Sequence, residues 1–188
     1  MIKTVFKRLA RLLCGDYAAY YIYRQQASAA VAASQPLDPA VVEITQAAIA
    51  GLTDSGLAGE SGYAGAGCHA YCLMLDGLPA GLCFYWHGER YASRGFWPLA
   101  SGQAKLVQIV TAPQARGRGV ATRLIAESAR RMAAMGWQVL YARVWHSHST
   151  SWRAFERAGW QRVALVLELN PLRRQTPLRL RLPNRLGP

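Results

Sequence analysis

One stretch of the sequence, Gln108 to Ala121, limits the fold of this chain more than any other. It reads QIVTAPQARGRGVA: an apolar strand ends, a proline forces a turn, and two glycines open a segment with helical periodicity. Glycine lets a backbone approach a ligand closely, and the first turn of a helix offers unpaired N–H groups to anions. Arg116 and Arg118 add permanent positive charge. The stretch therefore predicts a strand–turn–helix site for a pyrophosphate group.

The spacing within this stretch excludes two common nucleotide-binding loops. A P-loop ends in Gly-Lys followed by Ser or Thr, and the chain contains no such triplet. A dinucleotide fingerprint needs a third glycine three residues after the second, and Thr122 stands at that position. An ordinary glycine turn with surface arginines remains the alternative to a pyrophosphate site.

The rest of the sequence predicts a mixed α/β domain. Asp76-Gly77 between two apolar runs is a strong hairpin signal, and Gly136 suits the end of the helix that follows the glycine loop. On that helix we expect the pairs Arg123–Glu127 and Glu127–Arg131 on the exposed side. Strands are predicted at 17–24, 69–75, 80–87, 104–110, 139–144 and 160–169, and helices at 39–57, 120–135 and 149–158.

Length and composition favour one folded domain. The chain has 188 residues, of which 52% are hydrophobic and 17% charged, so it is too apolar to be disordered as a whole. No run of about 18 apolar residues occurs, which argues against a transmembrane helix. We expect an amphipathic basic helix at 1–16, a single domain at 17–170 and an Arg- and Pro-rich, extended or mobile tail at 171–188.

The charge of the chain is large and unevenly distributed. The net charge is +12, yet residues 25–89 contain no Lys or Arg and six acids. The basic parts therefore predict an anionic partner: a nucleotide, a nucleic acid or a membrane surface. Nucleic acid is disfavoured, because the tail lacks the aromatic residues on which bases stack. An anionic membrane surface, reached through residues 1–16 and the tail, remains open.

The four cysteines suggest thiols rather than a metal site. Cys68 and Cys72 lie in a strand-like run, and their spacing to Cys83 and His87 matches no zinc motif. We therefore predict no metal, and free buried thiols in a reducing compartment, with Cys14 the fourth.

Three motifs follow one another between residues 104 and 160. The loop Arg116 to Ala121 comes after a strand and a proline, an alternating strand follows at 140–144, and Ala158-Gly159-Trp160 ends the last helix. In this order they resemble the GNAT superfamily of acyl-CoA-dependent N-acyltransferases, whose loop signature is Arg/Gln-x-x-Gly-x-Gly/Ala. The resemblance covers 104–160 well and 17–169 loosely. It implies an α/β (α+β) fold: a central mixed, mostly antiparallel sheet flanked by helices, with two splayed strands that form the CoA slot.

The resemblance also implies a co-substrate, acetyl-CoA or another acyl-CoA. Its pyrophosphate would bind the amides of the loop, and its pantetheine arm would run beside the strand end at 109–111. A backbone N–H near Val110 would stabilise the oxyanion. The coenzyme-binding residues implied in this way are Ile109, Val110, Thr111, Arg116, Gly117, Arg118, Gly119, Val120, Ala121, His148, Ser151 and Phe155.

This chain departs from the family pattern at two places where proton transfer is expected. Gln108 stands where many members carry a carboxylate, five residues before the proline. On the last helix, His148 and Phe155 replace an Asn and the Tyr whose hydroxyl protonates the thiolate. Other titratable residues near the strand ends are then the candidates for general acid and base, each with a structural role as its alternative. They are His87, Glu89, Tyr141, His146 and His148.

The resemblance implies an N-acetyltransferase in which a primary amine attacks acetyl-CoA directly. The acidic segment 25–89 favours a small cationic amine as acceptor. Two alternatives stay open: an acyl-CoA-binding module with weak or no catalysis, and a basic protein associated with ribosomes, nucleic acid or membranes. We expect a cytoplasmic protein, with peripheral membrane attachment and a homodimer as open possibilities.

Overall fold

The structure is a computed structural model that describes residues 16–27, 36–92, 97–170 and 178–183. The described residues form one eight-stranded sheet with the strand order β2-β3-β4-β5-β6-β1-β7-β8. The strands are β1 (Asp16–Gln26), β2 (Val41–Glu43), β3 (Cys68–Leu75), β4 (Leu78–Trp86), β5 (Gln103–Thr111), β6 (Val139–Trp145), β7 (Gln161–Asn170) and β8 (Leu178–Pro183). The helices are α3 (Gln46–Ala50), α4 (Gly88–Ala92), α5 (Val120–Ala134) and α6 (Ser149–Arg157), with 3-10 turns η1 (Ala58–Tyr63) and η2 (Pro113–Ala115).

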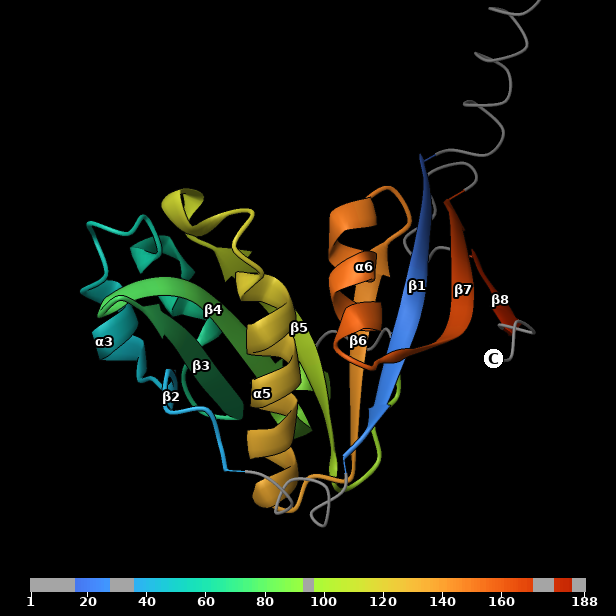
Figure 1. Ribbon diagram of the computed structural model, residues 1–188. Helices are drawn as coiled ribbons and strands as arrows, with labels where there is room; N and C mark the ends of the chain where they lie inside the picture. The colour runs from blue at the N-terminus through green and yellow to red at the C-terminus, as the bar shows by residue number, and fades with distance from the viewer. Residues whose placement is uncertain (1–15, 28–35, 93–96, 171–177, 184–188) are drawn as a thin grey trace, which may run out of the picture.

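The sheet opens between its two middle strands. All paired strands are antiparallel except β5 and β6, which are parallel and pair only between residues 103–106 and 139–142. Beyond that point the two strands diverge and divide the sheet into two arms. The first arm contains β2 to β5, and the second contains β6, β1, β7 and β8. Figure 1 shows α5 in front of the first arm and α6 in front of the second. The predicted fold, a mostly antiparallel sheet with two splayed strands, is confirmed.

Two glycine positions, one of them in the predicted hairpin turn, shape the arm that contains β3 and β4. Asp76 and Gly77 have φ values of 53° and 76°, the two positive values that a type I′ hairpin turn between β3 and β4 requires. In β4, a Cβ on Gly81 would lie 2.8 Å from the Val110 carbonyl oxygen and 2.9 Å from a Val120 methyl carbon. Only glycine therefore lets the first turn of α5 pack this closely on the sheet.

The prediction of a helix at 39–57 is wrong over most of its length. Val41–Glu43 instead add β2 to the edge of β3, a position that suits β-branched valines. The helix that follows, α3, has only five residues: the Thr45 hydroxyl accepts a hydrogen bond from the Ala48 N–H at one end, and Gly51 ends it. Pairing with β3 thus overrides the helical pattern of the sequence.

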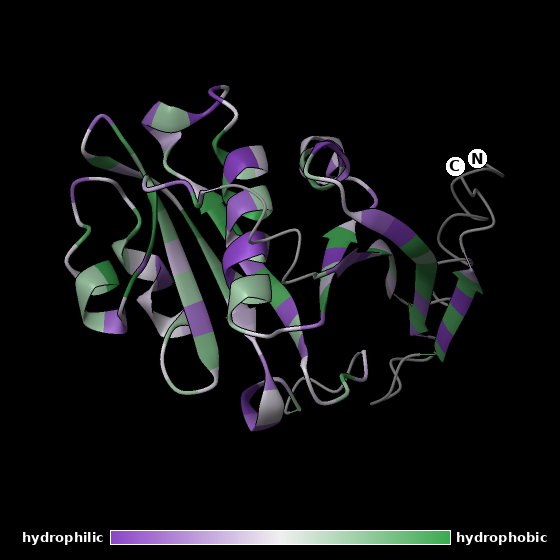
Figure 2. Cartoon of the chain, turned by 60° about the horizontal axis from the view of Figure 1, so that its bottom comes forward, coloured by the Kyte–Doolittle hydropathy of each residue, from purple (hydrophilic) through white to green (hydrophobic). Residues whose placement is uncertain are grey.

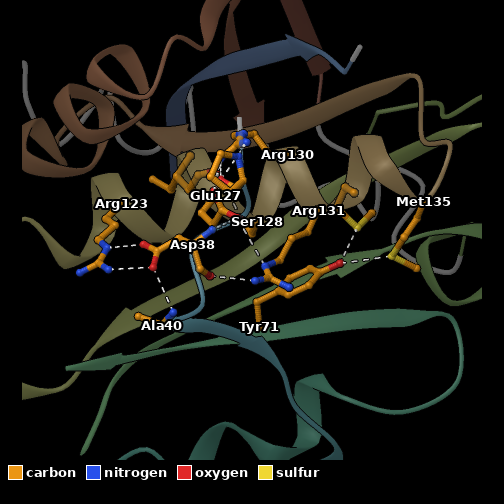
Figure 3. Close-up of polar contacts among 12 residues, drawn as sticks. Asp38, Ala40, Tyr71, Arg123, Glu127, Ser128, Arg130, Arg131 and Met135 are labelled. Carbon is orange, nitrogen blue, oxygen red and sulfur yellow. Dashed lines mark hydrogen bonds and ion pairs between the residues drawn. The ribbon is translucent and has the colours of Figure 1, made fainter. Parts of the chain in front are cut away.

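The polar face of α5 is covered by the chain that leads into β2, and this corrects the prediction of exposed ion pairs (Figure 3). The Glu127 side chain, 6% exposed, accepts a hydrogen bond from the Asp38 N–H at 2.8 Å. It also pairs with Arg130 at 2.8 Å and with Arg131, as predicted, at 3.6 Å. Arg123 does not pair with Glu127; it donates two hydrogen bonds, of 2.6 and 2.9 Å, to the Asp38 carboxylate.

The first strand lies far from the strand that follows it in sequence. β1 pairs antiparallel with β6 on one side and with β7 on the other. The Tyr20 hydroxyl donates to Glu168 at 2.7 Å, and the Tyr23 ring stacks on Phe155 with 5.5 Å between centroids. The strand predicted at 17–24 is therefore present, and it holds the second arm together.

Part of the Arg- and Pro-rich tail forms the edge strand β8, which the sequence did not predict as a strand. Leucines and arginines alternate along it, seen as green and purple bands on the outermost strand of Figure 2. The leucines lie beside those of β7, in the pairs Leu165–Leu182, Leu167–Leu180 and Leu169–Leu178. The N-terminal helix predicted at 1–16 falls outside the described residues except for Asp16, as do residues 171–177 and 184–188 of the tail.

The thiols in the described part of the chain are free, with Cys72 and Cys83 buried. Burial raises the pKa of Cys72 to about 11 and that of Cys83 to about 12, so both stay protonated at neutral pH. Cys14 lies outside the described residues. No described helix is long and apolar enough to cross a bilayer.

Candidate functional site

The predicted pyrophosphate loop borders a pocket of about 590 Å³. Gly117 and Gly119 both have positive φ, 77° and 76°, and a Cβ on either would meet no atom within 4 Å. Gly119 occupies the N-cap of α5, where no side chain caps the helix. The N–H groups of the first turn thus remain available to an anion, and the space beside both glycines is open.

Most of the implied coenzyme-binding residues line this pocket. Those present are Ile109, Val110, Thr111, Arg116, Gly117, Gly119, Val120, Ala121 and Ser151, joined by Ala115, Thr122, Thr150, Ala154 and Arg157. The side chain of Arg118 points elsewhere, because its guanidinium pairs with Asp76 at 3.0 Å. Arg157 is a cation that the sequence analysis missed. Its spacing of three from Ala154 and six from Ser151 on one helix face could have revealed it.

A second pocket, of about 310 Å³, lies where β5 and β6 diverge. Its lining comes from α4, β5, β6 and α6: Tyr91, Lys105, Leu106, Val107, Gln108, Ile109, Arg143, Val144, Trp145, His148, Ser151 and Phe155. Ile109 and Ser151 border both pockets, so the two are neighbours across these residues. A molecule held on the glycine loop could therefore extend toward a second reactant in the smaller pocket.

Strand geometry places backbone donors at this junction. The Ala112 N–H donates to Ala80 on β4. In an antiparallel ladder every second amide of a strand faces the same neighbour, so the amides of Ala112 and Val110 face β4. The amides of Ile109 and Thr111 then face away from β4, toward the opening. These neighbours of Val110 are the donors that a developing oxyanion could reach.

Of the five acid–base candidates, the structure places only His148 in the wall of the smaller pocket. His146 is exposed, with its ring 5.6 Å from that of Tyr21, and Tyr141 lies against Trp97 at 5.8 Å. His87 lines a separate pocket of about 550 Å³ beside α4, 4.7 Å from the Trp137 ring. Burial, and then the neighbouring His69, lower its pKa. Glu89 is exposed on α4 and lines none of the three pockets described here.

Gln108 stands where many family members carry a carboxylate, and in this chain it binds the carboxylate of a residue from another element. Its side-chain amide donates a 3.0 Å hydrogen bond to Glu60 of η1. Glu60 is half-buried and sits 48 positions earlier in the chain. In the sequence, Glu60 is only one of the six acids of segment 25–89, because no local pattern connects η1 with β5.

Phe155 contributes an apolar ring where the family pattern has a hydroxyl. It is 2% exposed and packs between Tyr23 and Trp160, with ring centroids 5.5 and 5.2 Å away. The Tyr23 hydroxyl donates to Glu156 at 3.0 Å, and burial raises the pKa of Tyr23 to about 12. The structure thus gives Phe155 a packing role on the pocket wall.

Comparisons with known proteins place this geometry in a family. A family model described as the acetyltransferase (GNAT) family matches residues 53–160. A search of curated proteins gave no significant match. A GNAT-family protein from Novosphingobium aromaticivorans has a similar structure, with 22% identity and a TM-score of 0.57 over 82% of this chain and 64% of its own. The chain therefore spans less than two thirds of that relative.

Two further solved structures share the fold. A GNAT acetyltransferase from Colwellia psychrerythraea matches with 11% identity and a TM-score of 0.56, over 88% of this chain and 60% of its own. The aminoglycoside acetyltransferase AAC(6')-Ib, solved with coenzyme A and kanamycin, matches with 15% identity and a TM-score of 0.53, over 77% and 94%. Because the family model covers more than half of the sequence and the architecture agrees, this chain belongs to the GNAT family of acetyltransferases.

Proposed function

We propose that the protein transfers an acetyl group from acetyl-CoA to a primary amine. The observation that carries this proposal is the junction at Ile109 and Ser151, where the glycine-loop pocket borders the smaller pocket. CoA would bind with its diphosphate on the first turn of α5 and its thioester near the opening between β5 and β6. The complex of AAC(6')-Ib with coenzyme A and kanamycin supports the same division between coenzyme and amine.

Acetyl transfer to an amine has three requirements. It must bring amine and thioester together, remove a proton from the ammonium, and stabilise the oxyanion that forms as the amine attacks. The amides of Ile109 and Thr111 are our candidate donors to the oxyanion. Glu60, held by Gln108 beside the pocket, is our candidate proton acceptor, and His148 in the pocket wall is the candidate that donates a proton to the leaving thiolate.

Two measurements test the proposal. Calorimetry should detect binding of acetyl-CoA, and a thiol assay with a panel of amines should detect release of CoA that depends on an amine. Binding of acetyl-CoA without turnover of any amine would favour the alternative, an acyl-CoA-binding module. Absence of binding would remove the coenzyme assignment altogether.

A further inference from the structure

The short turn η1, which carries Glu60, needs support from outside itself. It is a 3-10 helix of six residues, a form whose hydrogen bonds are poorer than those of an α-helix, and no side chain caps its N-terminal end. The last carbonyl groups of a helix also find no N–H partner within the helix. The position of the Glu60 carboxylate therefore depends on the groups that bind η1 from other elements.

Arg90 of α4 binds the C-terminal end of η1. Its Nη2 lies 3.0, 3.1 and 3.0 Å from the carbonyl oxygens of Gly62, Tyr63 and Ala64, and its two protons are shared among them. Its Nη1 donates to the Ala66 carbonyl at 3.1 Å. These residues are the last two of η1, its C-cap and the loop just beyond it. A guanidinium at this place satisfies the carbonyls that the helix leaves unpaired and complements the negative end of its dipole.

The surroundings of Arg90 fit its side chain closely. The guanidinium carbon lies 4.5 Å from the centroid of the Trp86 ring, and the Trp86 indole N–H donates to the Tyr63 carbonyl at 2.8 Å. Gly67 has a φ of 70°, and a Cβ there would lie 2.9 Å from the Cβ of Arg90. Strand β4, helix α4 and the end of η1 are thus joined at this one side chain.

The contacts of Arg90 lie close to Glu60 along the chain. Gly62 comes two residues after Glu60 in the same short helix. On its other side, the Glu60 carboxylate accepts the 3.0 Å hydrogen bond from Gln108, which lines the smaller pocket. Arg90 is not among the described residues that line this pocket. Any effect of Arg90 on a reaction there would therefore pass through the backbone of η1.

We propose that Arg90 is a positioning residue for Glu60: by binding the carbonyls at the end of η1, it holds the Glu60 carboxylate where Gln108 meets it beside the smaller pocket. This inference rests on the proposed function, in which Glu60 accepts the proton of the ammonium. A displacement of about 1 Å caused far from the reacting atoms can cost on the order of 100-fold in rate. Loss of Arg90 is therefore expected to act on kcat rather than on coenzyme binding.

The first test is a double-mutant cycle in the amine-dependent release of CoA. Arg90→Met should lower kcat by about 10- to 100-fold, with the Kd for acetyl-CoA and the KM for the amine changed by less than about twofold. In the Glu60→Gln background the same substitution should lower kcat by less than about twofold, because the group that Arg90 positions is already lost. Arg90→Lys, which keeps a cationic donor, should retain part of the activity.

The second test does not depend on turnover. The side-chain amide of Gln108 gives a pair of signals in 15N–1H spectra, identified by their absence in Gln108→Met. Arg90→Met should shift this pair, as Glu60→Gln does, since both change the carboxylate that Gln108 binds. The matched control is Arg24→Met, the loss of an exposed arginine on β1, which should change neither the signals nor kcat. Calorimetry with acetyl-CoA checks that each variant is folded, and Arg90→Lys carries the cycle if Arg90→Met is not.

The outcomes separate this inference from the proposed function. If the Arg90 variants leave kcat and the Gln108 signals unchanged, or lower kcat equally with and without Glu60, the positioning role is wrong and acetyl transfer still stands. A normal kcat in Glu60→Gln would overturn the role of Glu60, and that of Arg90 with it, again without affecting acetyl transfer. If acetyl-CoA binds but no amine is acetylated, the proposed function fails, and the Gln108 signals then decide whether Arg90 fixes Glu60.

Discussion

The two pockets that meet at Ile109 and Ser151 obtain their chemistry in different ways. The glycine-loop pocket, which is the proposed coenzyme site, relies on backbone: two left-handed glycines and the amides of one helical turn, nearly all within a single stretch of the chain. The smaller pocket relies on side chains from four separate elements. A site made of backbone tolerates many side-chain changes but few changes of φ, whereas a site made of side chains can be altered one residue at a time.

The largest expected effect is in the glycine-loop pocket. Gly119→Glu should raise the Kd for acetyl-CoA by at least about 100-fold, because the new side chain forces a strained φ and brings negative charge to the diphosphate site. Calorimetry measures it. Gly136→Glu is the matched control: that glycine also has positive φ, 91°, and open space, but lies just beyond the other end of α5. Equal weakening by both variants would contradict a local effect.

Beside the smaller pocket, Glu60→Gln tests the proposed proton acceptor. We expect kcat to fall by about 100-fold with little change in the Kd for acetyl-CoA, because general-base catalysis is worth about that much. A variant with normal kcat would exclude Glu60, and His148→Ala would then be examined in the same assay.

A smaller effect compares Arg157, which lines the glycine-loop pocket, with Arg118, which does not. Arg157→Gln should weaken acetyl-CoA binding by about 5- to 10-fold, as expected for one charge-assisted contact with a phosphate. Arg118→Gln should change the Kd by less than about twofold, since that side chain pairs with Asp76. The reverse order would mean that Arg118 leaves Asp76 when the coenzyme binds.

The smallest effect concerns the side chains that secure α5 behind the glycine loop. The hydrogen bonds from Arg123 lower the pKa of Asp38, so this carboxylate stabilises the fold above its unfolded pKa of about 3.9. That stability is lost as the pH falls through the lower, folded value. Asp38→Asn should cost about 1 kcal/mol of unfolding free energy at pH 7 and progressively less below pH 4, measured by urea denaturation. A pH-independent difference would argue against the ion pair.

The same contrast explains how much the sequence could predict. The loop, its strand and its helix form one contiguous pattern, so local rules were enough to predict this segment and, through the family resemblance it carries, the fold class. Glu60 escaped notice because only the tertiary structure brings it to Gln108, from 48 positions earlier in the chain. The helix predicted at 39–57 failed for a related reason, since its first residues pair with the edge of β3. Arg157 could have been predicted from its helical spacing to Ser151 and Ala154, and it was overlooked.

The position of β1 has a consequence for how the chain is made. Tyr20 and Glu168, which are hydrogen-bonded across β1 and β7, are 148 positions apart. β1 is made before both of its neighbours, so it must wait until β6 (Val139–Trp145) and then β7 (Gln161–Asn170) have been made. Such high contact order predicts slow closure of the second arm, with an aromatic strand exposed to chaperones in the meantime.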